Sequence, residues 1–217
     1  MAERAPKSSP LEMLAVAVLA TDGVEQVELE APIGAMQVAG ADVYIITPSG
    51  DAFRTVQNGE VGETLEADRA VSNTKAREYG ALLLPGGDAS VRALRTNTDA
   101  LRFIRDFAAM DRPIAAVDEA PVLLVEAEAV RGRTVTSSPA VANEIRDAGG
   151  VWVNEGVAVD QRLLTAKGAE NIRQFCSKLV DVLVQAVQDR TVDETSQESF
   201  PASDAPGWGP TSIGEPG

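Results

Sequence analysis

The chain has 217 residues, 44% of them hydrophobic, and a formal net charge of −14 at pH 7. This length and composition are typical of one globular domain with a sizeable core. The acidic balance, with no visible basic patch, argues against nucleic acid or an anionic membrane surface as a partner. Because the sequence contains no histidine, a histidine-based zinc site and Ser-His or Cys-His catalytic pairs are excluded.

The N-terminal segment and the single cysteine indicate in which cellular compartment the protein is expected. Residues 1–12 form a polar arm without the apolar centre of a signal peptide, and no apolar run reaches the ~18 residues of a membrane-spanning helix. Cys176 is the only cysteine of the sequence, so an internal disulfide is excluded. Its place on an apolar helix face indicates core packing. We therefore expect a cytoplasmic protein that does not bind membranes.

Strand-like and helix-like patterns alternate along residues 13–188, which we interpret as one domain. In chain order we expect a strand over 14–20, a helix over 25–39, a strand over 42–47, a hairpin within 48–66, a strand over 81–85, a loop over 88–97, a helix over 97–110, a strand over 113–117, a helix over 121–127 and a long helix over 171–187. Continuous apolar strands between helices indicate a parallel sheet that is covered on both faces.

The composition changes after residue 188. Residues 189–217 are acidic and rich in proline, glycine and serine, which is typical of a tail and not of a folded domain. Phe200 and Trp208 are its exceptions, and we expect them to dock the tail onto its own domain or onto a partner if they have a role.

The most informative motif is Ala116-Val117-Asp118-Glu119-Ala120, between an expected strand and an expected helix. Small residues on both sides of a central residue at a strand-to-helix turn are the layout of a nucleophile elbow. The central residue here is a carboxylate. Asp118 therefore has two interpretations: a chemical group above the carboxyl ends of the strands, or an N-cap of the helix, which Pro121 in the first turn would suit.

The order of segments resembles the DJ-1/PfpI family of the class I glutamine amidotransferase-like superfamily, over about residues 14–187. The resemblance depends on the elbow, on the turn Leu84-Pro85-Gly86-Gly87 and on the segment Val130-Arg131-Gly132-Arg133. It implies a flavodoxin-like α/β three-layer sandwich with a mainly parallel sheet, and a homodimer or a larger assembly. Where the family has Ala-x-Cys-His-Gly, this chain has Ala-Val-Asp-Glu-Ala, so the thiol and the adjacent histidine are both missing.

The resemblance also implies roles for other residues. Glu25 aligns with a glutamate that contacts the elbow residue, so Asp118 and Glu25 are expected to share a proton unless the pair is only a structural relic. Glu28 is expected on the helix surface. The backbone N–H groups of Gly86, Gly87 and Glu119 are candidate oxyanion donors and Ser138 is a candidate pocket residue; turn geometry and the charge preference of a helix N-terminus are the alternatives.

These observations leave three hypotheses about function open. The chain is a family member without thiol chemistry that serves as a stress-linked binding protein; or an enzyme, a hydrolase, hydratase or isomerase, that uses the Asp118/Glu25 pair; or an interaction module. ATP hydrolysis is excluded because no phosphate-binding Gly-x-x-x-x-Gly-Lys-Ser/Thr stretch exists. We expect no cofactor and no metal, and a small-molecule ligand at the elbow.

Overall fold

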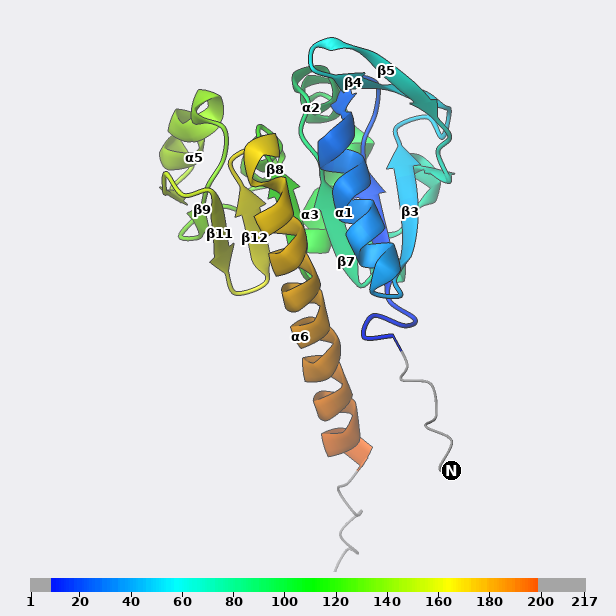
Figure 1. The fold of residues 1–217 in the computed structure, drawn as a ribbon. Helices are drawn as coiled ribbons and strands as arrows, with labels where there is room; N and C mark the ends of the chain where they lie inside the picture. Colours follow the sequence, from blue (N-terminus) through cyan, green and yellow to red (C-terminus); the bar gives the residue numbers. More distant parts are fainter. Residues whose placement is uncertain (1–8, 199–217) are drawn as a thin grey trace, which may run out of the picture.

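A seven-stranded sheet forms the centre of the computed structural model, which describes residues 9–198 and, for side chains, residues 9–190 (Figure 1). The strand order is β11-β12-β8-β7-β1-β3-β6, and all neighbours are parallel except β11 and β12. The strands are β1 (Ala15–Leu19), β3 (Asp42–Thr47), β6 (Arg69–Ala70), β7 (Ala81–Leu84), β8 (Ile114–Val117), β11 (Val157–Asp160) and β12 (Leu163–Ala166). β1, β7, β8 and β12 are almost entirely buried because helices cover both faces.

Helices lie on the two faces of this sheet, with α1 and α6 together on one face and α3 on the other (Figure 1). The helices are α1 (Gln26–Val38), α2 (Asp88–Arg95), α3 (Thr98–Ala108), α4 (Pro121–Glu126), α5 (Ala142–Asp147) and α6 (Ile172–Glu198). One core cluster packs Leu29 and Phe175 against the sheet, and the other packs Phe103 and Phe107 against the opposite face. This arrangement confirms the expected three-layer α/β fold.

Short elements connect and extend the main sheet. β2 (Val24–Glu25), β4 (Phe53–Gln57) and β5 (Glu60–Leu65) form a three-stranded sheet, in which the antiparallel β4–β5 pair is the expected hairpin. β9 (Thr134–Val135) pairs with β10 (Val151–Trp152). The remaining elements are the 3₁₀ helices η1 (Val71–Asn73), η2 (Ala76–Glu78), η3 (Pro139–Val141) and η4 (Ala169–Asn171).

Three sequence expectations differ from the structure. Residues 88–95 form α2 where a loop was expected, because burial of Val91 and Leu94 stabilises an eight-residue helix. α6 continues to Glu198, past the expected start of the tail at residue 189. Leu11, within the segment expected to be a polar arm, is fully buried. Phe200 and Trp208 lie outside the described residues.

None of the helices within residues 9–198 has the length and apolarity that crossing a membrane requires.

Candidate functional site

Asp118 occupies a sharp turn between β8 and α4. Its φ of 58° lies in the left-handed region, which non-glycine residues adopt rarely and at a cost of about 1–3 kcal/mol. Two backbone hydrogen bonds fix the turn: Asp118 N–H donates to Ala166 O at 3.0 Å, and Ser138 N–H donates to Asp118 O at 2.9 Å. The backbone therefore has the conformation of a nucleophile elbow, as the motif predicts.

The helix-cap interpretation of Asp118 is wrong. α4 begins at Pro121 with Ala120 as its N-cap, and no side chain caps it. The Asp118 carboxyl instead accepts a hydrogen bond from the Ser138 side chain and is hydrogen-bonded to Glu119. Ser138 thus lies beside Asp118 at the elbow.

Glu28, and not Glu25, is the glutamate that meets the elbow. Its side chain is only 2% exposed, and its Oε2 accepts a hydrogen bond of 3.1 Å from Gly86 N–H. A Cβ at Gly86 would collide with this oxygen and come within 2.8 Å of Asp118 Cβ, so the two acids lie on the same side of Gly86. The expectations for Glu25 as partner and Glu28 as a surface residue were both wrong, because β2 holds Glu25 in extended backbone and the helix begins one residue later.

Burial and the negative charge of nearby glutamates keep these two carboxyls protonated. Burial first, and then the neighbouring Glu119 and Glu28, raise the pKa of Asp118 from 3.8 to about 9. Burial also raises the pKa of Glu28 to about 8, although the hydrogen bond from Gly86 opposes this shift. Both groups therefore carry protons at neutral pH and lose them one at a time in mildly alkaline solution.

The three expected backbone donors differ in availability. Gly86 N–H is occupied by Glu28, so it was wrongly expected to be a free donor. In contrast, the N–H groups of Gly87 and Glu119 have no acceptor among residues 9–190. Gly87, at φ 101°, has no room for a side chain, because a Cβ would lie 2.6 Å from Glu25 N and collide with Gly23 O. Two donors thus remain on the elbow, as an anion or carbonyl oxygen would require.

Other polar groups of the site are acidic. Glu119 Oε2 is buried and has no hydrogen-bond partner. A Cβ at Gly168 would lie 2.9 Å from Glu170 Oε2 and 3.6 Å from Asp118 Oδ1, so Glu170 is a further carboxyl beside the elbow. Within the part of the chain that the structure describes, no group of three or more acids, cysteines or histidines is arranged to hold a metal ion. The chemistry available here is therefore that of carboxyl groups and backbone donors.

Cys176 is not part of the elbow motif. It lies on α6, half-buried against the core. Burial raises the pKa of its thiol, which makes it a poor nucleophile at neutral pH.

Sequence reasoning missed Glu28 and Glu170. A signal for Glu28 existed: it lies four residues before Pro32 and eight before Met36, so it belongs to the buried stripe of α1. Glu170 had no comparable signal, because it follows the sheet in an irregular segment.

A mostly parallel sheet with covered faces and an elbow after a central strand defines a class of α/β proteins that bind ligands at the carboxyl ends of their strands. The model of the DJ-1/PfpI family matches residues 15–182. The chain belongs to the DJ-1/PfpI family.

A relative of known sequence agrees with this assignment, and solved structures share the fold. Protein/nucleic acid deglycase 2 of Escherichia coli is 31% identical over 161 residues, which are 74% of this chain and 92% of that protein. Drosophila melanogaster DJ-1beta has a TM-score of 0.72 at 20% identity and covers 84% of this chain and 97% of its own. A two-domain protein of Anabaena variabilis, with DJ-1/ThiJ/PfpI-like and ferritin-like domains, has a TM-score of 0.74 at 24% identity, over 78% of this chain and 48% of that one.

Proposed function

We propose that this protein acts on a small, uncharged carbonyl compound at the elbow. Asp118 and Glu28 transfer protons to and from the substrate, and no thiol takes part. The observation that supports this most directly is the pair itself. Two carboxyls lie on the same side of Gly86, one buried and one held on a strained turn, and both have a pKa well above its ordinary value. Such displaced pKa values are concentrated at functional sites.

The free backbone donors support a carbonyl ligand. The N–H groups of Gly87 and Glu119 provide hydrogen bonds for a carbonyl oxygen that gains negative charge. An anionic ligand would meet Glu119, Glu170 and, above pH 8, an ionised member of the pair. An uncharged substrate avoids this repulsion.

When the pair is half-ionised, one carboxyl group can act as a base and the other as an acid. Near pH 8 to 9 the pair holds one proton, so that one carboxylate removes a proton from the carbon next to the carbonyl while the other carboxylic acid protonates the oxygen. If the proton is then returned to a different carbon atom and the other oxygen loses its proton, the substrate is isomerised. Thiol attack has no place here, since the elbow has no sulfur and Cys176 packs against the core.

A binding-only function is the second candidate, and the protonation at pH 7 favours it. In that state Asp118 and Glu28 are neutral hydrogen-bonding groups, which fits capture of a ligand without turnover. The E. coli relative is named a deglycase; if this chain acted on related adducts, it would have to do so through carboxyl groups.

The test is deuterium exchange into hydroxyacetone in D₂O, followed by proton NMR across pH 6 to 10. We expect exchange above the buffer rate with a maximum near pH 8 to 9, at least tenfold lower in Asp118→Asn and Glu28→Gln. Cys176→Ser is the matched control and should leave the rate unchanged. Exchange at the buffer rate in the wild type contradicts proton transfer, and ligand contacts at the elbow in saturation-transfer NMR would then identify the binding-only function.

A further inference from the structure

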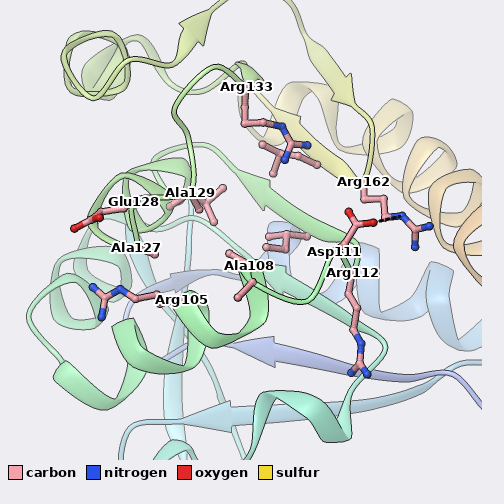
Figure 2. A pocket seen from close by; sticks show the side chains of 13 residues that line it. Arg105, Ala108, Asp111, Arg112, Ala127, Glu128, Ala129, Arg133 and Arg162 are labelled. Carbon is pink, nitrogen blue, oxygen red and sulfur yellow. Dashed lines mark ion pairs between the residues drawn. The ribbon is translucent and has the colours of Figure 1, made fainter.

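A cavity of about 300 Å³ lies at the opposite end of the sheet from the elbow (Figure 2). Its wall includes Ile114 and Leu163, the first residues of β8 and β12, whereas Asp118 follows the last residue of β8. The cavity therefore does not belong to the elbow site. Its volume is within the range of small-molecule sites.

The lining of this cavity combines an apolar floor with a cationic rim. Ala108 and Ala129 lie near its centre in Figure 2, and the strand-end residues Ile114 and Leu163 also line it. Four arginines surround the floor, against only two acids, which are Asp111 and Glu128; the arginines are Arg105, Arg112, Arg133 and Arg162. The lining itself therefore has more cationic than acidic side chains, in contrast to the −14 of the whole chain, while Asp160 and Asp189 outside it pair with Arg133 and Arg162.

The arginines are not all neutralised by carboxylates. Arg162 pairs with Asp111 and Asp189, and Arg133 pairs with Asp160, but Arg105 and Arg112 have no carboxylate partner among residues 9–190. Arg105 donates only to the carbonyl of Glu126, at 3.3 Å. Arg112 donates to the carbonyl oxygens of Arg77, at 3.0 Å, and Tyr79, and burial and the nearby charge of Arg190 lower its pKa.

Arg133 provides the inward-facing donor. In Figure 2 its side chain reaches from the upper rim toward the apolar centre. Its Nη2 donates to Asp160 O at 2.6 Å, and its buried Nε forms an ion pair of 3.5 Å with Asp160 Oδ1 but has no hydrogen-bond partner. An unsatisfied buried guanidinium N–H costs about 1–3 kcal/mol unless a ligand or water meets it.

We propose that this arginine-rimmed cavity binds a small amphiphilic anion, with its apolar part on the alanine floor and its carboxylate or phosphate group between the arginines. Arginine suits this role because its planar guanidinium binds such anions through two hydrogen bonds. Alanines on the floor leave the space that larger side chains would fill. The proposal is independent of the function at the elbow.

The test is titration of the full chain with phenyl phosphate, monitored by calorimetry and by methyl NMR. We expect saturable one-to-one binding that shifts the Ala108 and Ala129 methyl signals. Arg133→Gln and Ala129→Leu should each weaken it at least fivefold, the first by removing charge and the second by filling the floor. Arg102→Gln, on the same helix as Arg105 but outside the cavity, is the charge-matched control and should leave the affinity within twofold.

Two comparison ligands distinguish a built site from general attraction. Benzyl alcohol lacks the charge and inorganic phosphate lacks the ring, so both should bind at least tenfold more weakly than phenyl phosphate. Absence of saturable binding, an effect of Arg102→Gln equal to that of Arg133→Gln, or unchanged affinity in Ala129→Leu would each overturn the proposal.

Discussion

At the scale of single residues, the elbow places an aspartate where its backbone is strained and its carboxyl is held protonated. The strain at Asp118 persists because β12 and Ser138 each fix its peptide group. Glu28 supplies the second carboxyl and accepts a hydrogen bond from Gly86 N–H. Removing either acid thus changes the titration of a shared site and not only of one side chain.

Glu28→Gln should alter the pH dependence of stability. Glu28 ionises near 4.5 when unfolded and near 8 when folded, so the folded state binds an extra proton between these values. The free energy of unfolding of the wild type should therefore fall as pH rises from 4.5 to 8. In Glu28→Gln this slope should shrink, leaving the variant more stable at pH 9 by on the order of 2–4 kcal/mol.

Urea unfolding at pH 5, 7 and 9 measures this effect. Glu30→Gln, an exposed neighbour on α1, is the matched control. Parallel pH profiles for the wild type and Glu28→Gln would show that Glu28 is not held protonated.

At the scale of elements, the turn between β7 and α2 positions the site. Gly87→Ala should destabilise the protein by at least about 1–3 kcal/mol, because the backbone has φ 101° and the new Cβ would collide with the chain at Gly23. Gly34→Ala, on α1, is the control: its Cβ meets nothing within 4 Å, so helix propensity should add about 0.5–1 kcal/mol of stability. Thermal unfolding measures both, and equal effects would contradict the steric account.

The helix α6 holds one face of the sheet through its buried side chains. Phe175→Ala should cost about 3–5 kcal/mol, since Phe175 is fully buried in the core beneath the helix. The exposed neighbour Gln174→Ala should change stability by less than about 0.5 kcal/mol. A small effect of Phe175→Ala in denaturant unfolding would mean that α6 does not depend on this packing.

At the scale of the whole molecule, the acidic elbow and the cationic cavity lie at opposite ends of β8. Four strand residues separate them by roughly 13 Å, which exceeds the Debye length of about 10 Å at 0.1 M salt. Arg105→Gln should therefore leave the titration of Asp118 unchanged within about 0.2 pKa units at this salt concentration. A larger change in NMR titration would show that the two ends are electrostatically coupled.

The fold was predictable because buried strands and amphipathic helices have apolar residues at characteristic spacings in the sequence. The strand over residues 42–47 and the helix over 25–39 appear within a residue of their expected bounds. The elbow at Asp118 was predictable for the same reason, since small residues flank it locally.

The partner of Asp118 and the cavity depend on contacts that no local pattern contains. Glu25 and Glu28 are three residues apart, and only the extended β2 and the start of α1 at Gln26 decide which one turns inward. The rim arginines extend from Arg105 to Arg162 and come together only through the sheet topology.

The central claim is that Asp118 and Glu28 form one coupled, protonated pair. Carboxyl-detected NMR titration tests it most directly, with Glu28→Gln as the second sample. We expect Asp118 and Glu28 to titrate near 9 and 8 in the wild type, and the pKa of Asp118 to fall when Glu28 is replaced, because ionised Glu28 raises it. Titration of both groups near pH 4, with no change in the variant, would contradict the claim.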